Sequence, residues 1–382
     1  MYGDVHADTP KQKKKALFTA TVDSHILHFH LPYLKLLRDM GYEVHVITNG
    51  TEKIPGADKR HTVPFARSPL SLNNVQAYRM LRDIINHERY DLIHTHTPMG
   101  GVVTRLAARH SRKHHGSRVL YTAHGFHFYK GAPWHYWAMF YPIEKWLAHY
   151  TDTLITINKE DYNLARRKFA TRVEYVPGVG IDPAKFDFKF TAADKLALRK
   201  SLGLTKNDFV MIFPAELNKN KNQILLIEAM EQLVPKHPNI HLLLPGKDSY
   251  NGHYQRITAE KGLEKNIHFL GYRTDIPRLL KISDLAVSSS LREGLPVNLL
   301  EAAYCKIPIV AHKCRGVQSI KDSSAPSRTY IICNFFNSKL LIEEIEKMSS
   351  FSPQMREHES IEISDYVLEN TCKQYTKIYS AI

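Results

Sequence analysis

The sequence predicts an α/β protein made of two Rossmann-like domains, each a parallel sheet covered by helices on both faces. Three observations lead to this prediction. Short apolar runs of strand length alternate with amphipathic runs of helical period along the chain. The chain has 382 residues, more than a single hydrophobic core usually serves. Residues 177–183 hold two glycines and two prolines, a composition that breaks regular structure and suits a linker between domains.

The first half of the chain alternates strands and helices after a basic start. Residues 1–15 are predicted to be a flexible N-terminus, because they are polar and end in three lysines. Expected strands cover 16–22, 43–48, 92–94, 119–122, 153–157 and 173–176. A polar turn at Asp23, Ser24 and His25 is expected to precede an amphipathic helix. Later helices are expected at 72–86, 102–110, 136–149 and 159–168. Ligands of such a sheet bind at the carboxyl ends of its strands.

The second half repeats the alternation. Helices are expected at 195–202, 222–234, 254–261 and 276–282, and strands at 209–213, 240–244, 267–270 and 285–287. Residues 322–336 show no regular pattern apart from a weak strand at 330–333, and the chain is mainly helical from Leu340 on. The predicted domains are therefore 16–182, completed by a C-terminal helix at about 362–382, and 183–361.

Basic residues outnumber acidic ones, 52 to 38, which gives a formal charge of +14 and a pI near 9.4. This excess predicts an anionic partner, which can be nucleic acid, an acidic membrane surface or a phosphorylated substrate. The chain contains no recognised module with aromatic residues interleaved among lysines and arginines, so we predict no nucleic-acid partner.

The cysteines and the chain start bear on location. The four cysteines lie in the last third without paired spacing, which is typical of free thiols in a reducing cytosol. The polar start is unlike a signal peptide, and no segment approaches the roughly 20 apolar residues that span a bilayer. We expect a cytoplasmic protein that can associate peripherally with the inner face of the cell membrane.

The most informative stretch is 288–309, where a strand leads through a charged loop into a helix that begins near Pro296. Gly294 permits a tight turn, and proline is favoured at the first helical position. Amides at a helix start attract phosphate or hydroxyl oxygens. The backbone groups expected to face a ligand here are those of Gly294, Leu295, Val297, Asn298 and Leu299. Glu293 and Glu301 bracket these amides, and carboxylates accept hydrogen bonds from hydroxyls. A ligand with both phosphate and sugar hydroxyls is predicted.

This combination of features, over nearly the whole chain, resembles the family-4 retaining glycosyltransferases of the GT-B fold. The most specific element is the Glu-x7-Glu signature from Glu293 to Glu301. Other matching segments are Ala-Glu-Leu-Asn-Lys-Asn-Lys-Asn at 215–222, Thr-Ala-His-Gly-Phe-His at 122–127 and Val-Pro-Gly-Val-Gly-Ile-Asp at 176–182. Residues 21–25 and 28–33 are most similar to bacterial enzymes that build exopolysaccharide or capsule repeat units.

The resemblance implies roles for residues of the second domain. Glu301 would bind the ribose hydroxyls of a nucleotide-sugar, and Glu293 with the following amides would hold hydroxyls of the donor sugar. Lys221 would lie on the diphosphate, where a cation stabilises the charge that develops as the glycosidic bond breaks. Lys221, Glu293 and His124 are the predicted catalytic residues.

The sequence departs from the family pattern in two places. The family usually has a glycine and an arginine where this chain has Ala215 and Glu216, and a carboxylate cannot replace a phosphate-binding guanidinium. Either Lys219 or another cation substitutes, or Glu216 marks a subfamily that holds the donor differently. After Gly316, residues 323–330 replace the Gly-containing strand and loop that the family normally has.

The resemblance also suggests where the base binds. Gly271, Tyr272 and Arg273 end a strand of the second domain, at the position where the family binds the base. Their backbone groups can read a uracil edge, although the side chains can equally face solvent.

In the first domain, His124 resembles the active-site histidine of the family. It follows an apolar strand and precedes Gly125, and it is expected to contact a donor-sugar hydroxyl or to orient the acceptor. The alternative is a histidine that is merely hydrogen-bonded at a strand end. Ser24 and His25 follow the first strand and are candidates for contact with donor phosphate or acceptor. The alternative is helix capping by Ser24 or Asp23.

We considered a metal site because His94 and His96 lie two residues apart on one face of a strand. No third ligand stands out in the sequence. For these two, and for His30 and His127, a structural role is favoured. We predict no metal and no cofactor apart from the donor substrate.

Two features of the first domain predict a surface for the acceptor. Basic residues cluster on one expected helix and its exit, namely Arg105, Arg109, His110, Arg112, Lys113, His114, His115 and Arg118. Aromatic residues crowd a nearby stretch, namely Trp134, Tyr136, Trp137, Phe140, Tyr141 and Trp146. Cations attract anionic headgroups and aromatics suit a membrane interface, so the pair predicts docking for a lipid-linked acceptor. Core packing is the favoured alternative for Trp137, Phe140 and Tyr141.

The leading hypothesis is a retaining, metal-independent glycosyltransferase. It would move a hexose or N-acetylhexosamine from a nucleotide-sugar, with UDP as the expected carrier, to a lipid-linked saccharide in exopolysaccharide or capsule synthesis. One alternative is a non-hydrolysing UDP-sugar epimerase, which would act without an acceptor. The other is a catalytically silent glycosyltransferase-like subunit.

Overall fold

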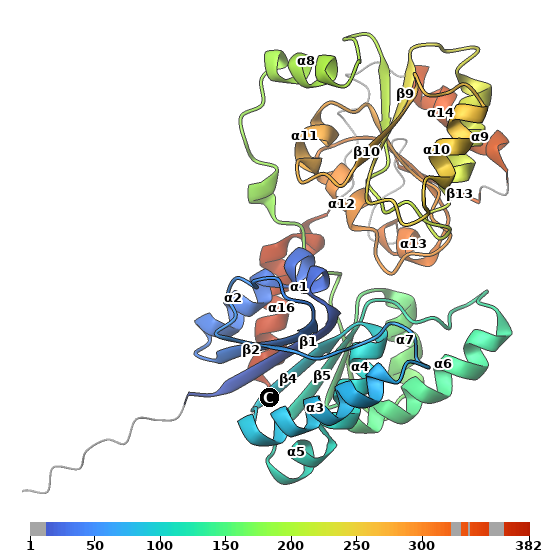
Figure 1. Ribbon diagram of the computed structural model, residues 1–382. Coiled ribbons are helices and arrows are strands. Elements are labelled where there is room, and N and C mark those ends of the chain that lie inside the picture. The colour runs from blue at the N-terminus through green and yellow to red at the C-terminus, as the bar shows by residue number, and fades with distance from the viewer. Residues whose placement is uncertain (1–12, 322–329, 335–336, 351–362) are drawn as a thin grey trace, which may run out of the picture. The chain divides into compact units, whose positions relative to one another are not determined.

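The computed structural model describes residues 13–321, 330–334, 337–350 and 363–382. The chain divides into two compact units, Met1–Val179 with Cys372–Ile382, and Gly180–Thr371 (Figure 1). The division falls inside the segment rich in glycine and proline. Residues 1–12 of the expected N-terminal tail, residues 323–329 and the expected helix start near residue 362 lie outside the described residues.

The first unit is built on a seven-stranded parallel sheet with the strand order β3-β2-β1-β4-β5-β6-β7. Its strands are β1 (Lys15–Val22), β2 (Glu43–Asn49), β3 (Lys59–Thr62), β4 (Leu92–His96), β5 (Arg118–Ala123), β6 (Thr153–Thr156) and β7 (Arg172–Tyr175). The order reverses between β1 and β4, because β2 pairs with one side of β1 and β4 with the other. Such a switch point leaves a crevice at the carboxyl ends of the strands, where ligands bind in open α/β sheets.

Helices cover both faces of this sheet (Figure 1). They are α1 (Asp23–Phe29), α2 (Leu31–Asp39), α3 (Asn73–Glu88), α4 (Pro98–Ala107), α5 (Arg109–His114), α6 (Trp134–Leu147), α7 (Lys159–Lys168) and α16 (Leu368–Ser380), with a short 3-10 turn at Ala148–Tyr150. Apolar residues of α3 and α4 pack on one face, against Leu17 and Ile93. On the other face, Tyr379 of α16 bonds His94, the next residue along β4. The two faces of β4 are thus buried by helices far apart in sequence.

The second unit has a six-stranded parallel sheet with the order β10-β9-β8-β11-β12-β13. Its strands are β8 (Phe209–Ile212), β9 (Ile240–Pro245), β10 (Ile267–Gly271), β11 (Leu285–Ser288), β12 (Ile309–His312) and β13 (Tyr330–Cys333). The order reverses between β8 and β11, so this sheet has a switch point of its own.

The helices of the second unit alternate with these strands. They are α8 (Ala192–Ser201), α9 (Gln223–Leu233), α10 (His253–Glu260), α11 (Ile276–Lys281), α12 (Val297–Tyr304), α13 (Arg315–Lys321) and α14 (Ser338–Ser350), with 3-10 turns at Pro183–Lys185 and Ser364–Tyr366. Buried side chains of α9, α10 and α14 share one core with β8, β9 and β11. No helix in the described ranges is long and apolar enough to cross a membrane.

The structure corrects several expected elements. β3 was not predicted, because this edge strand carries Lys59, Arg60 and His61 and has no apolar alternation. The single helix expected at 102–110 is two helices, α4 and α5, that meet at Ala108. β12 also escaped prediction, since it is only four residues long and is separated from the short helix α12 by residues 305–308 alone.

Candidate active site

In the second unit, Lys221 and Glu293 come together near the carboxyl ends of β8 and β11. Lys221 precedes α9, and Glu293 lies in the loop between β11 and α12. The Lys221 Nζ atom lies 2.6 Å from Glu293 Oε1. The amide of Leu291 donates to Asn220 O at 2.9 Å, and the Ser289 hydroxyl donates to Lys221 O at 2.9 Å. These bonds fasten the two loops, so the ammonium and the carboxylate are held in one place.

The turn at Glu293 rests on a glycine that the sequence did not single out as a site residue. A Cβ atom on Gly316, in the first turn of α13, would lie 2.8 Å from Gly294 O and 2.9 Å from Glu293 O. Real Cβ atoms essentially never approach oxygen that closely, so only glycine fits there without movement of the turn. Gly316 therefore allows the Glu293 loop to pack closely against the first turn of α13.

Glu301 is on α12 and is partly buried. Burial raises the pKa of its carboxyl group to about 7, and the nearby ammonium of Lys185 opposes this rise. Removal of water disfavours the charged form of a carboxylate, which is the cause of the shift. Near neutral pH the group is therefore poised between an acceptor-only form and a form that can also donate.

The start of α12 differs in detail from the expectation. Pro296 is the residue before the helix rather than its first residue, and Val297 begins the helix. The amide of Leu299 donates to Pro296 O at 3.1 Å. The side-chain amide of Asn298 donates to Pro214 O at 3.0 Å and so ties α12 to the end of β8. The Asn298 side chain thus holds the helix in position.

Glu216 and Lys219 lie in the loop before α9. The hydroxyl of Ser249 donates to the Glu216 carboxylate. The Lys219 ammonium lies 5.7 Å from the centre of the Tyr250 ring. A Cβ on Gly246 would lie 1.8 Å from Ala215 O, so the chain after β9 presses against this loop. Both candidate side chains are thus engaged by residues 249 and 250.

The residues expected at the base lie at the end of β10. Tyr272 is 64% exposed, and Arg273 forms an ion pair of 2.6 Å with Asp275. The guanidinium is thus paired with a carboxylate two residues along the chain, and the Gly271 carbonyl oxygen accepts a hydrogen bond from the Gly246 amide at 2.8 Å.

In the first unit, the segment after β1 is a helix rather than the expected turn. α1 begins at Asp23, and neither Asp23 nor Ser24 caps it with its side chain. The Asp23 carboxylate is buried and accepts hydrogen bonds from the Arg60 guanidinium at 2.8 and 2.9 Å and from the amide of Glu52 at 2.9 Å. Asp23 therefore anchors α1 to β3, and Ser24 is exposed. The capping alternative was wrong.

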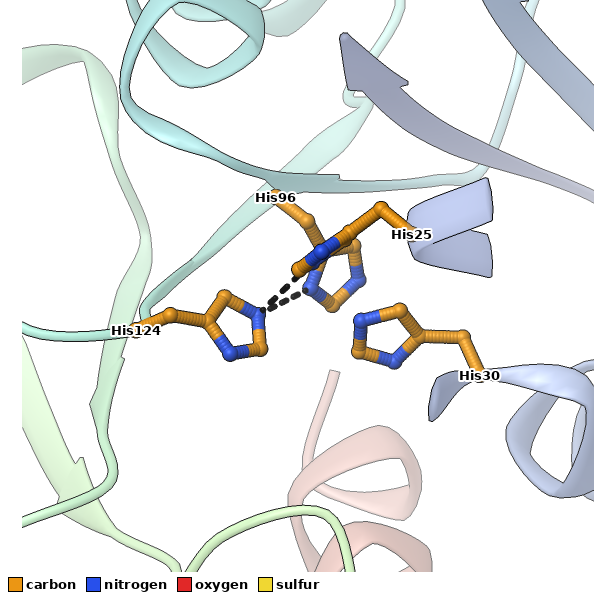
Figure 2. A group of neighbouring side chains, drawn as sticks. All are labelled: His25, His30, His96 and His124. Atoms are coloured by element: carbon orange, nitrogen blue, oxygen red, sulfur yellow. Dashed lines mark hydrogen bonds between the residues drawn. The ribbon is translucent and has the colours of Figure 1, made fainter. Parts of the chain in front are cut away.

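Four histidines gather at the carboxyl ends of β1, β4 and β5, at the switch point of the first sheet (Figure 2). His25 lies in α1, His30 between α1 and α2, His96 ends β4, and His124 follows β5. The Nε2 atom of His124 lies 3.3 Å from both His25 Nε2 and His96 Nδ1. The rings of His30 and His96 are 3.9 Å apart between centres. The sequence pointed to His25 and His124 and missed that His30 and His96 join them.

Burial keeps this histidine cluster uncharged. It lowers the pKa of His124 to about 4, and it holds the pKa values of His25, His30 and His96 well below their usual range. The mutual repulsion of neighbouring imidazolium forms adds to the effect of burial. A neutral imidazole is the form that can orient a hydroxyl or bind a metal ion.

His94 does not join the cluster, although it is two residues from His96. Its Nδ1 lies 2.9 Å from the Tyr379 hydroxyl and its Nε2 2.8 Å from the Thr122 hydroxyl. Both ring nitrogens therefore have partners inside the core. The favoured structural role of His94 is confirmed. The two-residue spacing of His94 and His96 therefore did not mark a pair of metal ligands.

A cavity of about 820 Å³ opens beside the cluster within the first unit. His25 and His124 line it together with mostly apolar side chains, among them Phe126, Met139 and Ile143. Glu144 and Tyr121 also line it, and behind them the buried Arg105 lies 2.9 Å from the Glu144 carboxylate and 4.0 Å from the Tyr121 ring centre. The space suits an apolar or amphiphilic ligand whose polar end meets the histidines.

Thr97 follows the cluster residue His96, lines the cavity and has a strained backbone conformation. Its φ is +65° and its ψ is 149°. A β-branched residue at positive φ is a steric outlier. Its hydroxyl accepts from the Thr21 amide at 3.1 Å and lies 2.7 Å from the Thr21 hydroxyl. These contacts between the ends of β1 and β4 hold Thr97, and thereby His96, in place.

The basic helix is less available than predicted. Arg105 is buried in its pair with Glu144, and Arg112 forms two 2.9 Å bonds with Asp152. A buried arginine cannot attract headgroups, so the expectation that Arg105 faces an anionic surface was wrong. For Arg112, which is partly exposed and paired with Asp152, contact with an anionic surface stays a prediction.

The aromatic helix α6 presents two different faces. Trp137, Phe140 and Tyr141 pack against a buried core around Phe128, which confirms the core-packing alternative for these three. Other side chains of α6 are exposed apolar groups, namely Trp134, Met139, Ile143 and Trp146. Met139 and Ile143 also line the cavity, so the exposed face of α6 is continuous with it.

Comparison with known proteins decides the family. The model described as Glycosyltransferase Family 4 matches residues 33–185, and the model described as Glycosyl transferases group 1 matches residues 194–359. EpsD of Bacillus subtilis (strain 168), a protein named as a glycosyltransferase, is 44% identical over 309 residues, 80% of this chain and 81% of EpsD. The chain is a family-4 glycosyltransferase. The resemblance seen in the sequence is confirmed.

More distant relatives of this glycosyltransferase carry more specific names. A UDP-Gal:alpha-D-GlcNAc-diphosphoundecaprenol alpha-1,3-galactosyltransferase of Escherichia coli is 27% identical over 251 residues, 64% of this chain and 63% of that protein. Among solved structures, Anabaena Alr3699/HepE in complex with UDP and glucose has a TM-score of 0.77 at 19% identity, covering 97% of this chain and 100% of the other. WaaG, a glycosyltransferase involved in lipopolysaccharide biosynthesis, has a TM-score of 0.71 at 16% identity, covering 95% and 99%. These structures confirm the predicted GT-B fold of two parallel-sheet α/β domains.

Proposed function

We propose that this glycosyltransferase moves a hexose or N-acetylhexosamine from a UDP-sugar to a lipid-linked saccharide during exopolysaccharide or capsule assembly, at the inner face of the cell membrane. The observation that carries the proposal is the placement of Lys221 beside Glu293 at the switch point of the second sheet. An ammonium there can neutralise a diphosphate, while carboxylates accept hydroxyls of the sugar and the ribose.

The choice of donor and acceptor draws on the relatives. The name of the Escherichia coli relative gives UDP-galactose as donor and a lipid diphosphate-linked sugar as acceptor, and HepE was solved with UDP and glucose. The apolar cavity beside His124 and the exposed face of α6 in the first unit suit the lipid part of such an acceptor.

In the proposed reaction, the bond between the sugar C1 and the diphosphate oxygen breaks, and an acceptor hydroxyl oxygen bonds to C1 on the same face. The acceptor proton passes to a phosphate oxygen, and UDP leaves as the diphosphate. Lys221 stabilises the charge on the departing diphosphate, Glu293 and Glu301 hold the donor, and His124 orients the sugar or the acceptor. No protein base and no metal ion is assigned to this step.

The test has two parts. A thermal-shift screen against UDP-, GDP- and ADP-sugars should give the largest rise in melting temperature with a UDP-sugar, since a ligand that binds only the folded state stabilises it by mass action. Incubation of that donor with polyprenyl-diphosphate-linked saccharides should then yield an extended product whose anomeric configuration matches the donor.

Three outcomes would contradict the proposal. Epimerisation of the donor without any acceptor would favour the epimerase alternative. Donor binding without turnover on any lipid-linked acceptor would favour the silent subunit. A product of opposite anomeric configuration would remove the retaining mechanism and leave the transferase.

A further inference from the structure

The histidine cluster of the first unit brings four ligand-type side chains to one point from four places in the chain. One ring nitrogen from each of His25, His30, His96 and His124 lies within 4.8 Å of those from the other three (Figure 2). Strand ends and helix starts of a parallel sheet position all four side chains, and such elements are more rigid than long loops.

Hydrogen bonding does not account for this arrangement. A neutral ring nitrogen is either a donor or an acceptor, and it acts in one direction in the ring plane. His124 Nε2 nevertheless faces two other ring nitrogens at 3.3 Å. Within the described part of the chain, both ring nitrogens of the fully buried His30 and the Nε2 of His96 have no hydrogen-bond partner. A buried polar atom without a partner carries its full desolvation cost.

A metal ion would take one ring nitrogen from each of the four histidines, including one of the two unpartnered nitrogens of His30. Imidazole nitrogens bind Zn²⁺ at about 2.0–2.1 Å, so the ligands of a tetrahedral ion lie roughly 3.3–3.4 Å apart. The two separations of 3.3 Å at His124 Nε2 match this edge length. The remaining pairs, which are no more than 4.8 Å apart, reach it with shifts of the rings. We propose that His25, His30, His96 and His124 form a binding site for a Zn²⁺-type transition-metal ion.

The other cluster of ligand-type residues in the first unit shows that proximity alone is not the argument. His45, His61 and Glu88 also lie close together. However, both ring nitrogens of His45 have partners, the Tyr90 hydroxyl at 2.8 Å and the Glu43 carboxylate at 2.7 Å. Two lysine ammonium groups contact the Glu88 carboxylate. Within the described residues, only the Nε2 of His61 lacks a hydrogen-bond partner in that cluster, whereas three ring nitrogens lack one in the first. The second cluster is therefore largely satisfied by protein groups and serves as a control for the first.

The chemistry of the four ligands selects the class of ion. Imidazole nitrogens suit Zn²⁺, Co²⁺, Ni²⁺ and Cu²⁺, whereas Mg²⁺ and Ca²⁺ require oxygen ligands. Four protein ligands leave no open position, which is the pattern of a structural rather than a catalytic ion. A bound ion joins α1 and the start of α2 to the ends of β4 and β5. It also binds His124 Nε2, so in the metal-loaded form this nitrogen can no longer form a hydrogen bond with a ligand in the cavity.

The test uses the purified full chain after removal of metals with a chelator. Co²⁺ is titrated as the probe, because four-coordinate Co²⁺ absorbs visible light far more strongly than six-coordinate Co²⁺. One tightly bound Co²⁺ per chain with the strong four-coordinate spectrum, displaced by Zn²⁺, is expected. The substitutions His30→Gln and His96→Gln should each weaken binding at least about 100-fold, since changes outside the ligand shell alone cost 10- to 100-fold.

Two matched variants serve as controls. His61→Gln alters the cluster of His45, His61 and Glu88, and His114→Gln alters a surface pair whose rings lie 4.5 Å apart on α5. Both should keep the bound Co²⁺ and its spectrum. If His96→Gln fails to fold by circular dichroism, His124→Asn replaces it, because His124 is only partly buried at the cavity.

The proposal is overturned if the wild-type chain binds no stoichiometric Co²⁺, if the spectrum is that of six-coordinate Co²⁺, or if the His30 and His96 variants retain the site. These results do not test donor binding by Lys221, Glu293 and Glu301, because those residues belong to the second unit. Metal binding is measured without donor or acceptor, so its failure and a failure of the transfer assay are told apart.

Discussion

At the carboxyl edge of the second sheet the candidate residues are charged and paired, whereas at the same edge of the first sheet they are neutral and several lack partners. Lys221 and Glu293 form an ion pair of 2.6 Å. His30 and His96 are buried, His25 and His124 are partly buried, and desolvation disfavours the charged forms of all four. Both groups lie at a switch point between strands. The same topology therefore prepares one edge for an anion and the other for neutral hydroxyls or a metal ion.

Removal of the Lys221 ammonium should have the largest effect on this difference between the two sheet edges. Lys221→Ala removes the charge proposed to stabilise the diphosphate, and it leaves Glu293 as an unpaired, largely buried carboxylate. We expect kcat to fall about 100- to 1,000-fold, the usual cost of losing one group that stabilises developing charge.

The control for this change is Lys261→Ala, which removes an ordinary ion pair with Glu231 on the surface of the same unit. Its kcat should stay near that of the wild type. An unchanged kcat for Lys221→Ala, measured with saturating donor, would remove Lys221 from the mechanism.

Gly316→Ala tests whether the rate of sugar transfer depends on the position of the Glu293 loop. The added methyl group must push the turn away, because it would lie 2.8 Å from Gly294 O. A displacement of about 1 Å near a reacting group can cost up to about 100-fold in rate, so we expect a loss of between about 10- and 100-fold in kcat.

The control is Gly262→Ala, where nothing lies within 4 Å of the added atom, although its φ of +65° disfavours alanine. That variant should lose stability and keep its kcat. Full activity of Gly316→Ala at a normal melting temperature would show that the loop adapts.

Glu301 should make nucleotide binding depend on pH. If the carboxylate form accepts the ribose hydroxyls, a pKa of about 7 predicts that UDP affinity falls about tenfold from pH 8 to pH 6. Glu301→Gln should bind more weakly at pH 8 and should lose this dependence in a calorimetric titration. An equal pH profile for the two proteins would exclude Glu301 as the titrating group.

The raised pKa of Glu301 also predicts how the stability of the fold changes with pH. The folded-state pKa of Glu301 lies above its ordinary value of 4.5, so the protonated form is favoured in the fold. The resulting stabilisation is complete below pH 4.5 and is lost as the pH rises through about 7. Glu301→Gln should therefore raise the melting temperature relative to wild type at pH 8, and this difference should shrink towards pH 5.

Membrane association should show the smallest effect. The exposed apolar face of α6 is continuous with the cavity, whereas Arg105 and Arg112 are engaged by carboxylates. Trp134→Ser should lower the bound fraction several-fold in flotation with anionic vesicles. The double change Lys113→Gln with Arg118→Gln should lower it less. The reverse ranking would restore the basic helix as the main contact.

Much of the fold was predictable because its signals are local. Apolar runs at 285–287 and 153–157 mark buried strands, and the expected helix at 159–168 coincides with α7. β3 was missed because an edge strand with Lys59 and Arg60 needs no apolar face. The break between α4 and α5 was missed because both halves continue a helical pattern.

The candidate site was predictable only where a motif carries it. The Glu-x7-Glu signature led to Glu293 and Glu301, and Lys221 followed from its segment. Gly316 and His30 were not assigned to a site, because their importance comes from contacts made in three dimensions. Asp23 was misread for a related reason, since its partner Arg60 lies on the strand that the sequence did not reveal.

The strained backbone of Thr97 limits how far the melting temperature of this enzyme can be raised without disturbing His96. A β-branched residue at positive φ costs on the order of 1–3 kcal/mol, so Thr97→Gly should raise the melting temperature. The glycine would lack the hydroxyl that joins Thr21, and the backbone after β4 could then adopt several conformations. His96 would lose its fixed direction, and a screen that selects for heat tolerance alone would favour this loss.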